Sequence, residues 1–357
     1  MPTRSLQSKF RDMLLSLFQN PSTNGAKTEV IINCPFCAKD GNPDNGKHFY
    51  MSLGLDNKPP MYNCFRNMNH HGLLTAAILE QISDYPTLID YNLLDDIKEE
   101  FKRSYIKSKY TIDTLEFTYN KNLNFNNKIN SISDLVDIKK SYICSRLGVD
   151  LSIDELCRIK TIFNIKDFLL QNNIQYFTRT PEIMDIFNTY FVGFLNNTNS
   201  YIVLRNMVHG KLDLKNDYMN KRYAHYKIIE NAISGNYIIP SECNILNHID
   251  IHISEGIFDI LSIYYNLRDM NYKNNIYVAM GGNAYLKTVK YFIEDLGLID
   301  IDFHIYIDND IENKVLSKVK KLTDSLLIDT YIHMNSYSGE KDFGVPKNRI
   351  SEYIYKL

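Results

Sequence analysis

Strand-like and helix-like segments alternate regularly in the last third of the chain. After His248, short apolar runs with a period of two residues are separated by longer runs with helical periodicity. This alternation predicts βαβ crossovers and a mostly parallel sheet. The predicted strands are 249–253, 276–280, 304–307 and 329–333, and the predicted helices are 258–267, 285–296 and 312–326.

The N-terminal part has a different pattern. Apolar residues at helical spacing predict an amphipathic helix that ends near Asn20-Pro21. From Thr28 onward, short apolar strands are separated by Gly, Pro and Asn turns, which predicts a compact β unit.

The middle of the chain is mixed. A charged helical pattern is followed by an Asn-rich stretch that is too poor in apolar residues to pack as a core element. Beyond it, helical patterns at 133–147 and 153–172 precede strand patterns at 190–194 and 201–204. We therefore expect an α+β multidomain protein. Its predicted parts are an N-terminal helix at 1–27, a small β unit at 28–82, a connector at 83–130, a mixed α/β subdomain at 131–247 and an α/β domain with a mostly parallel central sheet at 248–357.

Composition and charge narrow the class of protein. A chain of 357 residues with 44% hydrophobic and 23% charged residues is typical of globular domains. The 40 Lys and Arg residues against 42 Asp and Glu residues exclude nucleic-acid binding through overall positive charge, although a local basic groove stays open. The sequence has neither a membrane-spanning apolar run nor the apolar core of a signal peptide, so we expect a cytoplasmic protein without a membrane partner.

Four of the residues near the N-terminus have the spacing of zinc ligands. Cys34-Pro35-Phe36-Cys37 places two thiols on one tight turn, and Cys64 is followed by His70 and His71. Two such turns with two ligands each predict a zinc ribbon with structural Zn²⁺. The alternative, a redox-active Cys pair, would require a βαβ context and a helix that begins at the motif, whereas the local sequence predicts strands and turns. Only one of the adjacent histidines can face the metal, and we prefer His70 to His71.

Acidic residues follow two predicted strands of the C-terminal sheet. Glu255-Gly256 comes directly after one strand, and Asp308-Asn309-Asp310 comes directly after another. Functional groups gather beyond the carboxyl ends of parallel strands, so Glu255, Asp308 and Asp310 are expected to form an oxygen-rich site for Mg²⁺ or Mn²⁺. Asp342, after the last predicted strand, is a further candidate ligand. The alternatives are that Asp308 or Asp310 caps the following helix and that Glu255 is a surface acid.

This order of parts resembles the bacterial and phage type of DNA primase, which has an N-terminal zinc ribbon, a mixed α/β region and a Toprim domain. The Toprim motif consists of a glutamate-glycine pair after one strand and Asp-x-Asp after another, which Glu255-Gly256 and Asp308-Asn309-Asp310 match. Lys341-Asp342 is similar to the start of the later acidic motif of the family. The resemblance further implies that Asp259 completes the acidic set and that Gly281-Gly282 is the glycine turn after the second strand.

The resemblance also implies a basic strip that holds template or incoming nucleotide. The matching residues are Arg205, Lys221, Arg222 and Lys227. Six Lys or Arg residues against two Asp residues between positions 205 and 227 agree with it in sign, although a solvated charged face is the alternative. Where the family has a second acid after the later aspartate, this chain has Gly344.

The function that the resemblance implies is template-directed synthesis of short RNA primers on single-stranded DNA, from ribonucleoside triphosphates. It implies structural Zn²⁺ and catalytic Mg²⁺ or Mn²⁺. The chain would be a short form without a helicase-binding domain, working with a separate replicative helicase, and it would act in the host cytoplasm if phage-encoded. Two alternatives remain: another Toprim enzyme, either a topoisomerase or a nuclease, and a non-catalytic zinc-dependent protein that binds single-stranded DNA.

Overall fold

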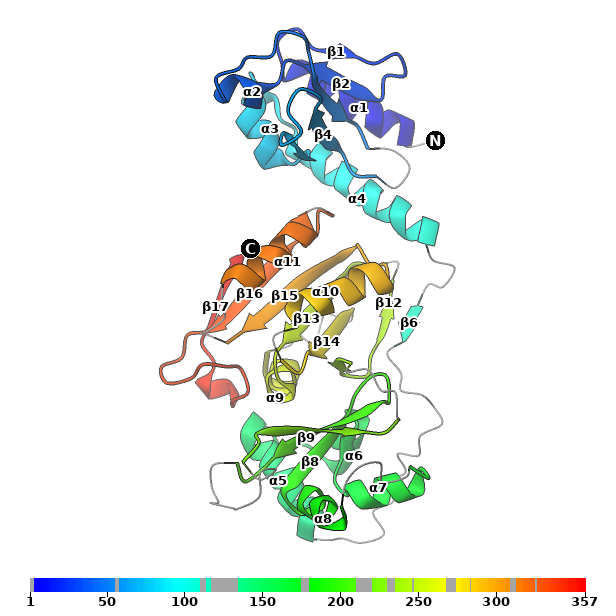
Figure 1. Cartoon of the computed structure of the whole chain (residues 1–357), viewed down its shortest axis with the longest axis vertical. Helices are drawn as coiled ribbons and strands as arrows, with labels where there is room; N and C mark the ends of the chain where they lie inside the picture. Colours follow the sequence, from blue (N-terminus) through cyan, green and yellow to red (C-terminus); the bar gives the residue numbers. More distant parts are fainter. Residues whose placement is uncertain are drawn as a thin grey trace. The chain divides into compact units, whose positions relative to one another are not determined.

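The chain forms two compact units in the computed structural model, and each is described by itself (Figure 1). One unit contains Met1–Asp113, Phe292–Ile301 and Lys318–Asp329, and the other contains Thr114–Tyr291, Asp302–Ser317 and Thr330–Leu357. The structure describes residues 3–54, 58–109, 114–116, 134–174, 180–209, 220–229, 235–245, 247–267, 274–282, 284–308, 313–324 and 326–357.

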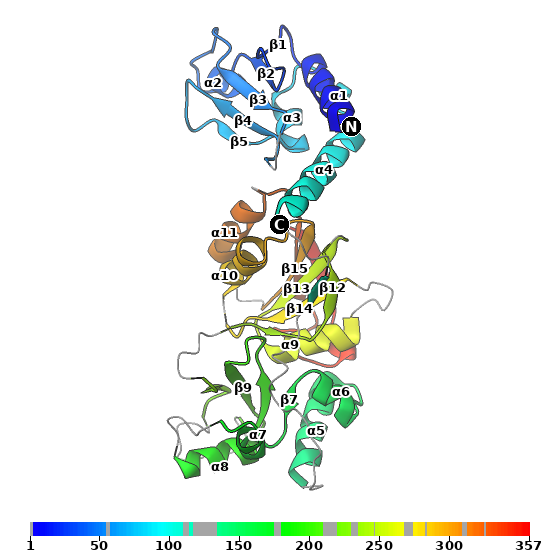
Figure 2. The same cartoon turned by 90° about the vertical axis from the view of Figure 1, so that its right-hand side faces the viewer.

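An antiparallel sheet of five strands forms the centre of the first unit, in the order β1-β2-β3-β4-β5 (Figure 2). Each strand pairs with its neighbour in sequence, as expected for strands joined by turns. The strands are β1 (Ser22–Thr23), β2 (Glu29–Ile32), β3 (Phe49–Ser52), β4 (Met61–Cys64) and β5 (His71–Leu73). The helices are α1 (Thr3–Ser16), α2 (Pro35–Lys39), α3 (Ala76–Ile82), the 3-10 turn η1 (Pro86–Leu88) and α4 (Tyr91–Lys109).

One face of this sheet is buried beneath helices. Alternating residues of β2 and β3, among them Val30 and Phe49, share a core cluster with Phe10 of α1. Leu93 and Ile97 of α4 belong to the same cluster. The segment predicted as a connector therefore contributes α4 to the N-terminal core, because one face of this otherwise charged helix is apolar. Residues 110–113 and 117–130 of that segment lie outside the described residues.

A four-stranded antiparallel sheet follows in the second unit, in the order β10-β9-β8-β7. Its strands are β7 (Thr161–Ile162), β8 (Phe191–Leu195), β9 (Tyr201–Asn206) and β10 (Tyr223–Lys227), and its helices are α5 (Asp134–Leu147), α6 (Ile153–Arg158), α7 (Ile165–Gln171) and α8 (Pro181–Tyr190). The single helix predicted over 153–172 is wrong, because Lys160 adopts a positive φ of 60° and Asn164 caps a new helix. The chain therefore forms α6, β7 and α7 in place of one helix.

Lys139 of α5 lies in the interior of this region and leads to a prediction. Its ammonium group donates hydrogen bonds to the backbone oxygens of Phe163 and Asn188. Burial lowers the pKa of Lys139 to about 7 from an ordinary value of 10.5. Between these two pH values the unfolded chain binds more protons than the folded one, so the free energy of unfolding is expected to rise with pH there.

Replacing Lys139 with methionine should flatten this rise. Urea denaturation at several pH values from about 7 to about 9, in the lower part of the interval set by the two pKa values, would measure it. Lys140→Met is the matched control, because the Lys140 side chain is partly exposed and lies 3.8 Å from Asp150. An equal rise of stability with pH in both variants would contradict the assignment.

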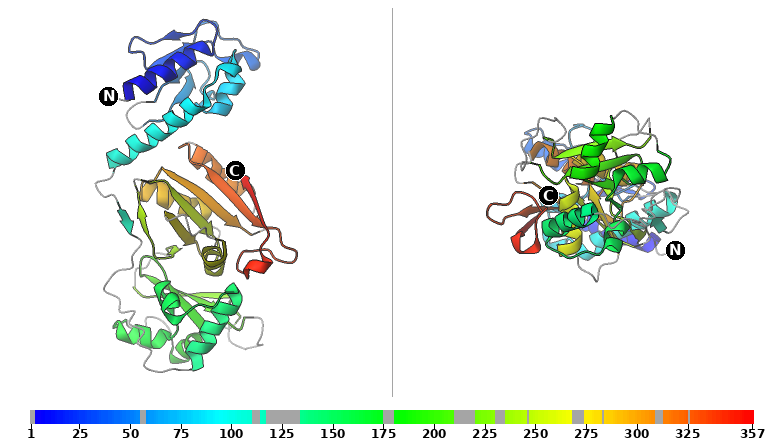
Figure 3. Two further views of the ribbon diagram at one scale, coloured as in Figure 1. Left: turned by 180° about the vertical axis from the view of Figure 1, so that it is seen from behind. Right: turned by 90° about the horizontal axis from the view of Figure 1, so that it is seen from below.

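The C-terminal sheet has six strands in the order β11-β14-β13-β15-β16-β17. Strand β13 runs parallel to β14, and β15 runs parallel to β16, whereas β11 and β17 pair antiparallel at the two edges. The strands are β11 (Tyr237–Ile238), β13 (Ile249–Ser254), β14 (Asn275–Ala279), β15 (Ile301–Ile307), β16 (Thr330–Asn335) and β17 (Glu352–Lys356). Figure 3 shows this sheet from behind, with β16 and β17 in orange and red at one edge. The four strands predicted from the alternating pattern are β13, β14, β15 and β16.

Helices connect these parallel strands, as the pattern predicts. They are α9 (Ile257–Ser262), which continues as the π-helical turn η2 (Ile263–Leu267), then α10 (Tyr285–Lys290), which continues as η3 (Tyr291–Asp295), and α11 (Asn313–Asp324). A two-stranded ladder of β6 (Thr114–Glu116) with β12 (Glu242–Asn244) and the 3-10 turn η4 (Lys347–Arg349) complete the described elements.

The four-stranded and six-stranded sheets share one hydrophobic core. Phe194 of β8, Phe258 of α9 and Tyr237 of β11 belong to the same buried cluster. The rings of Phe194 and Phe258 meet edge to face, with centroids 5.9 Å apart. Because of this shared core, β10 lies beside the loops that follow β13 and β15.

Candidate functional site

Three thiols and one imidazole converge in the N-terminal unit. The Sγ atoms of Cys37 and Cys64 are 3.8 Å apart, and Nδ1 of His70 is 3.5 Å from Sγ of both Cys34 and Cys37. Zn–S bonds of about 2.3 Å and Zn–N bonds of about 2.0 Å give tetrahedral edges of about 3.8 Å and about 3.5 Å. The four residues could therefore hold a metal ion such as zinc.

The chain around the first two thiols forms a short helix. Cys34 is the N-cap of α2, and its Sγ accepts a hydrogen bond from the Cys37 backbone nitrogen at 3.4 Å. The expectation that the motif contains only strands and turns is thus corrected, because Pro35 is well suited to the first helical turn. The helix lies between antiparallel strands and not in a βαβ unit. Burial raises the pKa of Cys34 to about 12 and also raises that of Cys37, whereas a reactive redox thiol needs a lowered pKa.

The structure places His70, and not His71, beside the thiols. Nε2 of His70 lies 2.9 Å from Oδ2 of Asp40, so this nitrogen donates to the carboxylate and leaves Nδ1 unprotonated toward the sulfurs. His71 is exposed, and its Nδ1 lies 2.6 Å from the backbone oxygen of Met68. The carboxylate-histidine arrangement is typical of metal-binding histidines.

A buried carboxylate fixes the first metal-binding turn. Oδ2 of Asp44 accepts hydrogen bonds from the backbone nitrogens of Cys34 at 2.9 Å and His48 at 2.8 Å. Burial alone would raise the pKa of Asp44, but the hydrogen bonds from His48, Gly46 and Cys34 hold it well below its usual range. This ionised carboxylate orients the backbone that carries Cys34.

Acidic residues from four segments line a cavity of about 130 Å³ in the second unit. Glu255 follows β13, Asp308 follows β15, Asp342 follows β16, and Asp259 lies in the first turn of α9. They meet because the carboxyl ends of parallel strands share one edge of the sheet. Asp310 lies outside the described residues, so the structure says nothing of its place.

Basic side chains and a neighbouring carboxyl group surround the acids of this cavity. Oδ2 of Asp308 lies 3.8 Å from Nζ of Lys341, and Oδ2 of Asp342 lies 3.7 Å from the Arg222 guanidinium. Burial, together with the carboxylates of Asp342 and Asp308, raises the pKa of Asp259 to about 8, against a hydrogen bond from the Gly256 nitrogen. Carboxylate oxygens are the donors that Mg²⁺ and Mn²⁺ prefer. Among the described residues, however, no three of these acids bring ligand oxygens within 4.8 Å of one another.

Two glycines leave room for the Asp259 carboxylate. A Cβ atom at Gly256 would lie 2.6 Å from its Oδ2, and a Cβ atom at Gly344 would lie 2.6 Å from its Oδ1. Position 344, where the resembling family has an acid, therefore cannot carry a side chain while Asp259 keeps this place. Asp259 supplies the carboxylate on that side of the cavity.

The residues of the predicted basic strip differ in their exposure to solvent. Lys221, Arg222 and Lys227 have exposed or partly exposed side chains, and Arg222 lines the acidic cavity. Arg205 differs from the expectation. Its side chain is buried, its Nε donates to the Tyr142 hydroxyl at 3.2 Å, and its guanidinium lies 4.6 Å from the centre of the Tyr223 ring. The Arg205 side chain is buried because β9, the strand that carries it, is buried along most of its length.

Sequence reasoning missed His225 of the cavity wall, whereas Tyr223 adjoins the predicted strip residues Lys221 and Arg222. Tyr223 and His225 lie on β10 opposite Arg205 and Val203 of β9, and both line the cavity with Arg222. Residues 223, 225 and 227 alternate on one face of β10, and this alternation could have indicated His225. Counting charged residues along the segment does not use this periodicity. Gly281 and Gly282 also line the cavity, with φ values of 70° and 135° that favour glycine.

Comparisons of the chain with protein-family models, with curated proteins and with solved structures found no match. In the part of the chain that the structure describes, no helix is both long enough and apolar enough to cross a bilayer.

Proposed function

We propose that the protein is a DNA primase of the bacterial and phage type, which synthesises short RNA primers on single-stranded DNA at a Toprim-like site. The observation that carries the proposal is the cavity at the carboxyl ends of parallel strands, which Glu255, Asp259, Asp308 and Asp342 line together with Arg222, Tyr223 and His225. We further propose that it acts in the cytoplasm with a separate replicative helicase.

Each group around the cavity has a role in this reaction. Glu255 and Asp308, with Asp310, would hold Mg²⁺ or Mn²⁺, which when bound stabilises the negative charge that develops during nucleotidyl transfer. Arg222 would bind phosphate oxygens, because its guanidinium is partly exposed beside the acids. Tyr223 and His225 form the opposite wall and would orient the nucleotide.

The N-terminal unit that contains Cys34, Cys37, Cys64 and His70 offers a surface for unpaired bases. The ring of Phe65 packs against Tyr50 with centroids 4.8 Å apart, yet its side chain is 68% exposed. Met68 nearby in sequence is 85% exposed. Phe49 instead lies in the core, whereas Phe65, which directly follows β4, is exposed enough to stack on a template base. We propose that this unit, with Zn²⁺ bound, contacts the single-stranded template.

The proposal is tested by incubating the full-length protein with single-stranded DNA, ribonucleoside triphosphates and Mg²⁺. New short RNA that depends on the template is the expected product, measured by incorporation of labelled nucleotide. Nicking of labelled DNA without RNA would overturn the proposal in favour of a Toprim nuclease or topoisomerase. Binding of single-stranded DNA without either product would overturn it in favour of a non-catalytic binding protein.

A further inference from the structure

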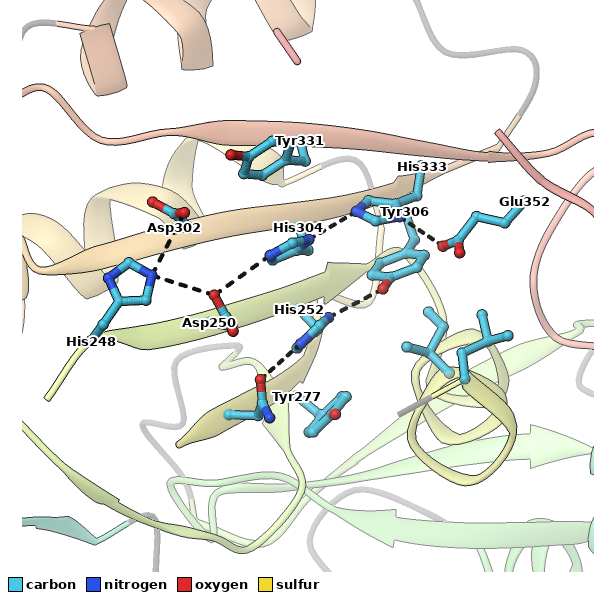
Figure 4. Close-up of a pocket in the computed structure, with 13 residues that line it drawn as sticks. His248, Asp250, His252, Tyr277, Asp302, His304, Tyr306, Tyr331, His333 and Glu352 are labelled. Carbon is cyan, nitrogen blue, oxygen red and sulfur yellow. Dashed lines mark hydrogen bonds and ion pairs between the residues drawn. The ribbon is translucent and has the colours of Figure 1, made fainter. Parts of the chain in front are cut away.

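A second polar pocket lies on one face of the C-terminal sheet (Figure 4). It has a volume of about 500 Å³ and contains four of the nine histidines of the chain. These are His248, His252, His304 and His333. Asp250, Asp302 and Glu352 line it as well. Neither the Cys3His cluster nor the proposed primer synthesis uses any of these residues.

The pocket lies toward the opposite ends of the strands from the acidic cavity. His248 precedes β13, and Asp250 and Asp302 are the second residues of β13 and β15. Glu255 comes five residues after Asp250, so at about 3.3 Å per residue the two groups are about 16 Å apart along the strand. A ligand bound at the pocket would therefore be separate from one bound at the cavity.

Three possible ligand atoms converge at one end of the pocket. Nε2 of His248 lies 3.4 Å from Oδ1 of Asp250 and 3.6 Å from Oδ2 of Asp302, and the three groups offer atoms within 4.8 Å of one another. These separations exceed the usual length of about 2.7–3.2 Å for an N–H···O hydrogen bond. They are close to the edge of about 3.4 Å that metal–nitrogen and metal–oxygen bonds of about 2.0–2.1 Å give in a tetrahedral site.

A chain of hydrogen bonds from Glu352 through His333 ends at His304, which lies beside these three residues. The Glu352 carboxylate accepts from Nδ1 of His333 at 2.7 Å, which leaves Nε2 of a neutral His333 as an acceptor. Nδ1 of His304, at 3.0 Å, therefore donates to that nitrogen. Nε2 of His304 lies 3.6 Å from Oδ1 of Asp250.

The rings that carry this chain of hydrogen bonds are held firmly. His304 stacks between Tyr331 and His252, with centroids 5.1 Å and 4.9 Å away, so its nitrogens cannot easily turn from Asp250. Nε2 of His304 is therefore held in place beside the three ligand atoms.

We propose that His248, Asp250 and Asp302 bind a divalent transition-metal ion such as Zn²⁺, with His304 held beside the bound ion. One imidazole and two carboxylates match Zn²⁺, Co²⁺ or Mn²⁺ better than Ca²⁺, which prefers six to eight oxygen ligands. Three protein ligands leave a coordination position open to the pocket. The inference does not depend on the proposed primase activity.

The test is the zinc content of the full-length protein after equilibrium dialysis against micromolar Zn²⁺ with excess Mg²⁺. Wild-type protein is expected to bind two equivalents, one at the Cys3His cluster and one at this pocket. His248→Gln and Asp302→Asn are each expected to bind the second equivalent at least tenfold more weakly. His248 is partly exposed, at 42% of its side chain, so its replacement should not disturb folding.

Two controls separate this site from the others. His209→Gln changes an exposed histidine outside the pocket and should keep both equivalents. Co²⁺ bound by thiolates has an intense near-ultraviolet band that Co²⁺ bound by nitrogen and oxygen lacks, so His248→Gln should leave that band unchanged. One equivalent in the wild-type protein, or two equally tight equivalents in His248→Gln and Asp302→Asn, would overturn the proposal.

Discussion

Replacing Asp308 with asparagine is expected to lower the rate of primer synthesis at least a hundredfold. A carboxylate that holds a catalytic metal ion contributes several kcal/mol to stabilisation of the transition state, and each 1.4 kcal/mol or so is a factor of ten in rate. Asp308 lies at the carboxyl end of β15 and lines the same cavity as Glu255 and Asp259. The measurement is incorporation of labelled ribonucleotide on a single-stranded template.

The same substitution should leave the folded protein as stable as before, or more stable. Asp308 is one of the neighbouring carboxylates that raise the pKa of Asp259, so removing its charge relieves repulsion within the cavity. A loss of activity with an unchanged or increased melting temperature separates a metal-binding role from a structural one. Asp295→Asn is the control, because it makes the same chemical change at an exposed aspartate outside the cavity. Normal primer synthesis by the Asp308 variant would refute the assignment.

Cys64→Ser is expected to abolish metal binding at the Cys3His cluster and to unfold the N-terminal sheet. Structural zinc contributes about 10–16 kcal/mol of apparent binding free energy in zinc-finger peptides, which is as large as the whole stability of many domains. Cys64 is fully buried at the end of β4 and belongs to the core cluster with Cys34 and Cys37. Zinc content and limited proteolysis within residues 3–109 would measure the two effects.

Cys144→Ser serves as the matched control. The Sγ atom of Cys144 accepts a hydrogen bond from the Leu151 nitrogen at 3.4 Å, which a serine hydroxyl can also do. This variant is expected to keep its zinc and its resistance to protease. A Cys64→Ser protein with full zinc content and wild-type proteolysis would show that the cluster is not a structural metal site.

The sequence predicted the C-terminal strands well because their apolar positions alternate with polar ones between helical segments. The contribution of α4 to the N-terminal core was missed, since its Leu93 and Ile97 lie among many charged residues. The burial of Arg205 was missed for another reason. Nothing in the local pattern shows that Phe258 and Tyr142, far apart in sequence, enclose that strand face.

Some residues of the candidate sites could likewise be predicted from local sequence, and others depended on contacts between distant segments. Cys34, Cys37 and Cys64 could be selected from spacing alone, whereas the choice between His70 and His71 depended on the turn that places Asn67 and Asp40 around one ring. The histidine pocket could not be seen in the sequence at all. His252, His304 and His333 are single residues on three strands, and the pairing of β15 with β13 on one side and with β16 on the other brings them together.

Stacked rings cross four neighbouring strands of the C-terminal sheet in the order Tyr277, His252, His304 and Tyr331. Their successive centroids are 4.6, 4.9 and 5.1 Å apart. A slip of β15 by one residue would turn His304 into the core and bring Phe303 to the face of the pocket. The ring stack therefore favours the observed register of β15, because a shifted β15 would lose its ring contacts with both neighbouring strands at once.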